Sequence, residues 1–145
     1  MPTEKVNEAT RREWRELGFF YERNDVTKEW LIRGSRAGLF RLAQALLEYS
    51  KNPRRQPISE HDHLGPYMYL KIGTWSARVI DNHWNAGTLE DLSTLSALIA
   101  ERISKAAEGD ALLLRAAYAP ASPYELRLDV SGDGFDPATA DKACW

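Results

Sequence analysis

Residues 28–47 read KEWLIRGSRAGLFRLAQALL, and within this stretch a strand pattern changes into a helix pattern. The first part contains Trp30 and Ile32, an aromatic and a β-branched residue of the types that favour strands. Ser35 follows Gly34 and is a suitable N-cap, because its hydroxyl can accept a free N–H of the first helical turn. Apolar residues then recur at helical spacing, which predicts one buried stripe: Leu39, Leu42, Ala43, Leu46 and Leu47.

A second strand-to-helix junction follows this stretch, and pairs of strands are expected before and after the two helices. From Trp14 the pattern is strand-like, with Phe19, Phe20 and Tyr21 as aromatic strand formers. The turn residues Asn24 and Asp25 separate this run from a second one around Trp30, which indicates a hairpin before the first helix. Thr88 and Asp91 resemble a capping box at the start of a second helix. Further strands are expected over residues 67–72, 78–84, 111–118 and 124–130. The order ββα-ββα-ββ predicts an α+β fold with an antiparallel sheet of about six strands and two helices on one face.

Length and composition predict a single domain over residues 1–145, with tails at residues 1–10, where a helix could start, and at residues 131–145. The chain is 43% hydrophobic and 28% charged, as in ordinary globular proteins. No apolar run is long enough to cross a bilayer, and the first residues lack the apolar core of a secretory signal. Cys144 is the single cysteine, which favours a reducing compartment. We therefore expect a cytoplasmic protein without a membrane partner.

Charge argues against nucleic acid as a partner. The net charge of −2 excludes the broad basic footprint of a nucleic-acid binder. Residues 1–55 contain twelve Lys and Arg against eight Asp and Glu, whereas residues 56–145 contain seven against thirteen. An acidic second half would steer encounter with a basic partner, unless folding interleaves the two halves.

The segment 52–66 is long for a connection and contains the motif His61-Asp62-His63. On a strand, residues two apart share one face, so both imidazoles could reach one metal ion, with His83 as a third ligand. Neither paired cysteines nor a His-Glu-x-x-His helix accompanies them, and no nucleophile or phosphate-binding motif occurs. The sequence therefore predicts no metal site, cofactor or catalytic residue. A small metal-dependent or hydrolytic enzyme using these three histidines is the alternative.

Four aromatic residues follow this segment: Tyr67, Tyr69, Trp75 and Trp84. In a strand, Tyr67 and Tyr69 would share the open face of the sheet, while Met68 and Leu70 would face the helices. Tyrosine and tryptophan anchor many protein interfaces, although they also form cross-strand pairs that stabilise sheets. The predicted partner-binding residues are His61, Asp62, His63, Tyr67, Tyr69, Trp75 and Trp84.

The strand and helix around Gly34-Ser35-Arg36-Ala37-Gly38-Leu39, followed by His61-Asp62-His63-Leu64 and another strand, resemble a known family. They are similar to small immunity proteins of bacterial polymorphic toxin systems, over about residues 28–75. The resemblance implies neutralisation of a partner toxin by tight binding in the cytosol. The expected function is thus a non-enzymatic protein-binding domain, as a monomer or homodimer; a structural homodimer through the open sheet face is a further alternative.

Overall fold

The structure, a computed structural model, describes residues 3–145 and confirms the α+β class. In chain order its helices and strands are α1 (Glu4–Leu17), β1 (Phe20–Asn24), β2 (Glu29–Ser35), α2 (Arg36–Ser50), β3 (His61–Leu64), β4 (Leu70–Thr74), β5 (Val79–Ile80), β6 (Asn85–Gly87), α3 (Leu89–Ser104), β7 (Ala111–Leu113), α4 (Arg115–Tyr118) and β8 (Glu125–Ser131). Short 3-10 helices lie at η1 (Pro53–Arg55), η2 (Pro66–Met68), η3 (Pro137–Ala140) and η4 (Lys142–Cys144).

The strands form two four-stranded sheets, in the orders β1-β2-β8-β7 and β3-β4-β6-β5. Both sheets are mixed, since β2 pairs with β8 and β4 with β6 in parallel. The prediction of one antiparallel sheet of about six strands is therefore wrong. Turn chemistry predicts pairing between strands adjacent in sequence, whereas β8 reaches β2 from the far end of the chain.

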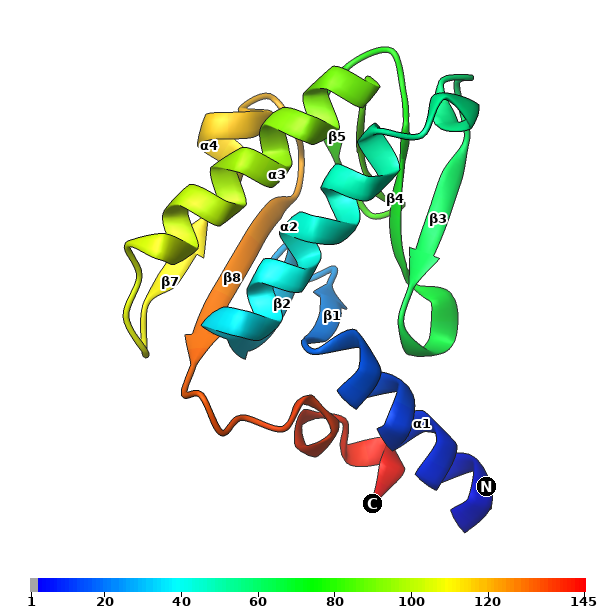
Figure 1. Cartoon of the computed structure of the whole chain (residues 1–145), viewed down its shortest axis with the longest axis vertical. Helices are drawn as coiled ribbons and strands as arrows, with labels where there is room; N and C mark the ends of the chain where they lie inside the picture. Colours follow the sequence, from blue (N-terminus) through cyan, green and yellow to red (C-terminus); the bar gives the residue numbers. More distant parts are fainter. Residues whose placement is uncertain (1–2) are drawn as a thin grey trace.

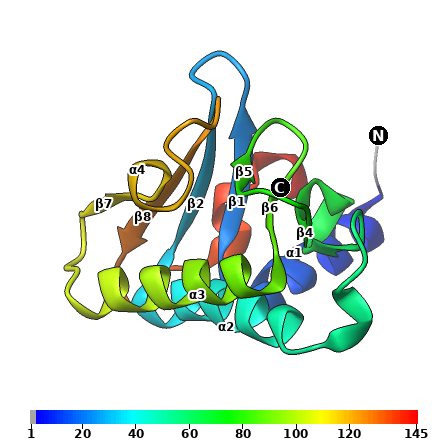
Figure 2. The ribbon, with the colours of Figure 1, turned by 90° about the horizontal axis from the view of Figure 1, so that it is seen from above.

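Both predicted helix starts are confirmed. The Ser35 hydroxyl accepts the N–H of Gly38 at 3.0 Å, and Thr88 and Asp91 form a reciprocal capping box. Helices α2 and α3 pack against each other, and Figures 1 and 2 show both on the same side of the strands. The apolar stripes of both helices are buried in the core, except that Leu47 is half-buried. Two helices on one side of the sheet layer are thus confirmed.

The ends of the chain differ from the prediction of two tails. Helix α1 begins at Glu4, within the predicted first tail, and Trp14 lies in this helix rather than in a strand. Residues 137–144 form η3 and η4, which contact α1, and Figure 1 shows this C-terminal segment beside α1. Trp14 is 1% exposed and Cys144 is equally buried. The two ends of the chain therefore bury each other's side chains. The residue pattern within either segment does not indicate this contact.

Two predicted strands are shorter than expected. The range 78–84 contains β5 and the loop before β6, and the range 111–118 divides into β7 and α4. Among residues 3–145, no helix has the length and apolar character needed to cross a membrane.

Candidate interaction surface

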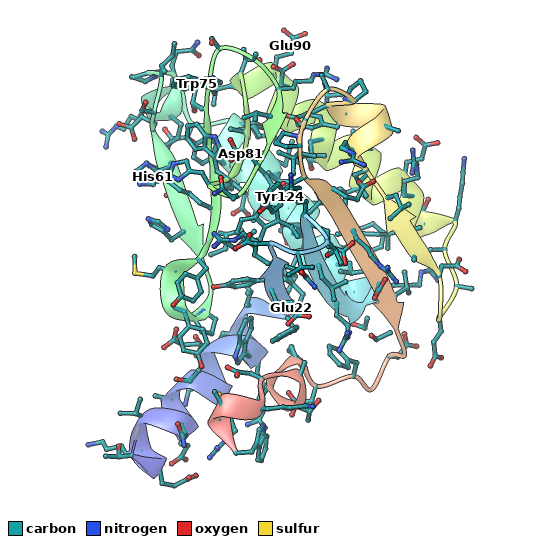
Figure 3. All side chains as sticks on the ribbon, turned by 180° about the vertical axis from the view of Figure 1, so that it is seen from behind. Glu22, His61, Trp75, Asp81, Glu90 and Tyr124 are labelled. Carbon is teal, nitrogen blue, oxygen red and sulfur yellow. The ribbon has the colours of Figure 1, made fainter. Side chains whose placement is uncertain are left out.

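The predicted site residues gather mainly on the side of the sheets away from α2 and α3. Figure 3 looks onto this side, where His61 and Trp75 lie toward one end and Glu22 lies further along. Two hollows occupy it, and both are lined by residues from segments that are distant in sequence.

His61 and His63 lie on strand β3, which pairs antiparallel with β4. Both side chains are exposed, and their ring centroids are 5.1 Å apart. The Nδ1 of His61 lies 2.9 Å from the carbonyl oxygen of Ser59, and the Nδ1 of His63 lies 2.8 Å from that of Met68. Each ring therefore donates to the backbone, which fixes its orientation.

Asp62 lies on the opposite face of β3, because successive side chains of a strand alternate. Its carboxylate forms an ion pair with Arg55. The structure therefore separates Asp62 from the two histidines and gives it a local partner.

The first hollow, the histidine hollow, has a volume of about 420 Å³. The Nζ of Lys71 lies 2.9 Å from the Nε2 of His83, so a neutral imidazole accepts from the ammonium. Burial and the charge of Lys71 lower the pKa of His83, which favours this neutral form. The hollow is lined by Ser59, His61, Lys71, Trp75, Val79, Asp81, His83 and Trp84.

Within residues 3–145, no group of three or more His, Cys, Asp or Glu side chains could hold one metal ion. His61, His63 and His83 are therefore not gathered as ligands of one metal ion in this structure.

The two tryptophans of this hollow differ in exposure. Trp75 is 40% exposed, whereas Trp84 is 7% exposed. The ring of Trp84 covers Gly73, where an added Cβ would lie 2.4 Å from ring carbons. Trp84 is therefore mainly a packing residue, and Trp75 presents the larger surface.

Tyr67 and Tyr69 precede strand β4, so their predicted place on a strand is wrong. Residues 66–68 form η2, in which Tyr67 and Met68 adopt left-handed backbone conformations with φ of 66° and 61°. Gly65 and Pro66 turn the chain before β4 begins at Leu70. Tyr67, Met68 and Tyr69, the tyrosine loop, project with exposed fractions of 48%, 61% and 66%.

Asp141 holds the tyrosine loop in place. Its Oδ2 accepts hydrogen bonds from the Tyr67 hydroxyl at 2.6 Å, the Trp14 indole at 2.9 Å and the Cys144 thiol at 3.1 Å. Burial opposes the charge of Asp141, but these hydrogen bonds outweigh it and hold the pKa of the carboxyl below its usual value. Burial and the adjacent carboxylate raise the pKa of Tyr67.

The second hollow, the aromatic pocket, lies between β1 and the tyrosine loop and has a volume of about 440 Å³. The ring centroid of Trp14 lies 4.9 Å from that of Phe20, 5.0 Å from Tyr21 and 6.3 Å from Tyr67. The pocket is lined by Trp14, Phe20, Tyr21, Glu22, Arg23, Tyr67, Tyr69 and Asp141.

Sequence reasoning missed most of this pocket. Phe20 and Tyr21 were expected only as strand formers, and Asp141 fell within a predicted tail. A turn-rich composition hides the role of Asp141, because two of its three side-chain donors, Trp14 and Tyr67, come from distant parts of the chain.

Comparisons with protein families, with curated proteins and with solved structures found no match for this chain.

Proposed function

We propose that this chain is a non-enzymatic protein-binding domain whose contact surface centres on the tyrosine loop. The observation that carries the proposal is the exposure of Tyr67, Met68 and Tyr69 in a conformation that the buried Asp141 holds. Left-handed backbone at residues other than glycine costs free energy and is concentrated at functional sites. A loop held before binding also loses less conformational entropy when a partner docks.

His63 connects this loop to the rest of the proposed surface. Its ring donates to the carbonyl oxygen of Met68, and His61 lies on the same face of β3. Trp75 adds an exposed aromatic side chain beside the histidine hollow. Exposed tyrosine and tryptophan with polar neighbours are typical of interface centres.

For the partner, we propose a toxin that this chain neutralises as an immunity protein. The resemblance to that class rests on the junction after Gly34 and on the His-x-His-Leu segment. In the structure, the junction leads from β2 into α2, and the histidine segment is a strand beside the tyrosine loop. The exposure of the histidine segment beside the tyrosine loop supports the proposal, because a partner can reach both segments at once.

The test uses the product of the reading frame adjacent to this gene. We expect its expression alone to stop bacterial growth and its co-expression with this chain to restore growth. The variant Tyr69→Ala with Trp75→Ala should lose this rescue and weaken the purified complex at least tenfold, because aromatic anchors dominate interface energies. The control Val26→Ala alters a residue that is 94% exposed at the β1–β2 turn and should keep full rescue.

A harmless neighbour, or equal rescue by the double variant and the control, would contradict the proposal. Light scattering of the chain alone reports separately whether it is a monomer or a homodimer. If the double variant instead melts at a clearly lower temperature than the parent chain, the aromatic residues belong to the fold and the surface lies elsewhere.

A further inference from the structure

The aromatic pocket contains two carboxylates that form no ion pair with a basic side chain of residues 3–145. Glu22 is exposed on β1, and Asp141 is buried beneath the tyrosine loop. Neither takes part in an ion pair in this part of the chain, and the side-chain donors to Asp141 are neutral groups of Trp14, Tyr67 and Cys144. The pocket therefore carries uncompensated negative charge.

The nearby basic groups do not neutralise this charge by direct pairing. Arg23 lines the pocket, but its guanidinium pairs with Asp25 and donates to the carbonyl oxygen of Asn82 at 2.6 Å. Arg33 and Lys142 line an adjacent hollow that also includes Glu22 and Asp141, and among residues 3–145 neither forms an ion pair with them. A cation that enters the aromatic pocket would thus not have to displace an existing salt bridge.

Aromatic rings supply most of the remaining wall: Trp14, Phe20, Tyr21, Tyr67 and Tyr69. The π electrons of such rings attract cations, most strongly where water is excluded. Trp14 and Tyr21 are almost fully buried and form the inner part of the pocket, whereas Tyr67 and Tyr69 are exposed at its rim. Figure 3 shows Glu22 on the same side of the molecule as His61 and Trp75.

We propose that the aromatic pocket receives the cationic side chain of an arginine or lysine on the protein partner. This inference rests on the proposed function and names the chemistry that the partner presents. The carboxylates of Glu22 and Asp141 provide charge complementarity, and the aromatic rings contact the aliphatic stem and the charged head. Arginine is one of the residues that dominate interface energies, and such anchors lie in well-packed, desolvated pockets.

The experiment follows backbone and indole NMR signals while N-acetyl-arginine amide is added to the whole chain. N-acetyl-citrulline amide is the matched neutral probe, because it has nearly the same shape without the charge. We expect saturable shifts at the Trp14 indole and at residues 67–69 with arginine amide, and at least fivefold weaker binding of the citrulline probe, as cation–π and charge contributions together imply. N-acetyl-lysine amide should bind at the same place.

Variants locate the effect. Glu22→Gln removes one exposed carboxylate, and Tyr69→Leu removes one ring whose hydroxyl makes no hydrogen bond within residues 3–145. Each should weaken arginine amide binding about fivefold. Glu8→Gln makes the same charge change at an exposed position of α1 outside the pocket. It should keep the affinity for arginine amide within about twofold of the parent chain, because distant exposed charges are screened.

Equal binding of the arginine and citrulline probes, or unchanged binding to Glu22→Gln, would overturn the inference. This result is distinguishable from failure of the proposed function. If a partner binds the parent chain and Glu22→Gln equally well, the protein-binding proposal stands and the inference that the pocket binds a cation is wrong. If arginine amide binds but the product of the adjacent reading frame is not toxic, the inference about the pocket stands and the proposed immunity role is wrong.

Discussion

At the scale of single residues, Asp141 is the side chain that joins most parts of the candidate surface. One carboxylate oxygen accepts from Trp14 of α1, Tyr67 of the tyrosine loop and Cys144 near the C-terminal end. Hydrogen bonds to a charged acceptor are stronger than neutral ones, and burial increases the cost of leaving a donor unsatisfied. Asp141 therefore couples the fold of both chain ends to the presentation of the proposed binding loop.

Replacing Asp141 by Asn should lower stability in a pH-dependent way. Asparagine keeps an acceptor oxygen but loses the charge, so we expect a loss of about 2 kcal/mol near neutral pH. The folded-state pKa of Asp141 lies below its unfolded value, so its contribution is present above about pH 4 and is lost as pH falls through the folded-state pKa. The stabilities of the parent chain and of Asp141→Asn should therefore approach each other as the pH falls. Urea unfolding of both proteins, at neutral pH and at successively lower pH, measures this change.

Asp133→Asn is the matched control for this measurement. Asp133 is exposed, and its side chain makes no hydrogen bond within residues 3–145. Its replacement should change stability by less than about 0.5 kcal/mol, as is usual for surface substitutions. A stability difference between the parent chain and Asp141→Asn that stays constant at all pH values would contradict the assignment of a charged acceptor.

At the scale of elements, the end of α1 lies against the first turn of α2. Gly18 caps α1 with a φ of 92°, and its N–H donates to the carbonyl oxygen of Trp14 at 3.0 Å. A Cβ on Gly38 would lie only 2.1 Å from the carbonyl oxygen of Gly18. Gly38 is therefore required by helix-to-helix contact, which explains a residue that helix propensity alone disfavours.

Gly38→Ala should destabilise the protein even though alanine favours helices. Helix propensity alone would stabilise the variant by up to about 1 kcal/mol. The backbone clash with Gly18 should reverse this sign and give a net loss of about 1–3 kcal/mol, the usual cost of overpacking. Thermal and urea unfolding both measure the change.

The comparison variant is Gly134→Ala, where an added Cβ meets nothing within 4 Å. We expect its stability to stay within about 0.5 kcal/mol of the parent chain. If Gly38→Ala proved as stable as the parent, α1 would not pack on α2 as described.

At the scale of the whole molecule, the C-terminal segment closes one end of the structure. Residues 137–144 contact α1, and the guanidinium of Arg11 lies over the ring of Trp145 at 4.6 Å from its centroid. The Trp145 indole in turn donates to the carbonyl oxygen of Ala138 at 3.0 Å. The main contacts of η3 and η4 are with α1 and β1 rather than with α2 and α3.

Deleting residues 137–145 should therefore loosen one end of the molecule and leave the other end ordered. Hydrogen exchange should become faster by about tenfold or more in α1 and at residues 67–69, because their packing partners are lost. Amides of α2 and α3 should keep their protection. Uniformly faster exchange, or no change in α1, would show that the segment does not act locally.

Several features could be predicted from local pattern because local chemistry determines them. The hydroxyl caps of Ser35 and Thr88 and the apolar spacing after them predict α2 and α3. The β1–β2 hairpin follows from Asn24 and Asp25, and Asn24 accepts backbone N–H groups of that turn. Of the predicted site residues, His61 and His63 share one strand face, as their spacing indicates.

The errors in the sequence prediction concern interactions between distant segments. Tyr67 and Tyr69 alternate like strand residues, but Gly65, Pro66 and the bond to Asp141 hold them in a loop. Trp14 resembles a strand aromatic, but its indole donates to Asp141, 127 residues further along the chain. Such contacts have no signature within a window of neighbouring residues.

Local sequence pattern is enough to predict the α+β class, helices α2 and α3 and the hairpin, because caps, turns and apolar periodicity act over a few residues. The two mixed sheets, the packing of both chain ends and the meeting of carboxylates with aromatic rings beside β1 became visible in the folded chain alone. The physical reason is that burial and hydrogen bonding between distant segments depend on the position of the whole chain. Local propensity carries no information about that position.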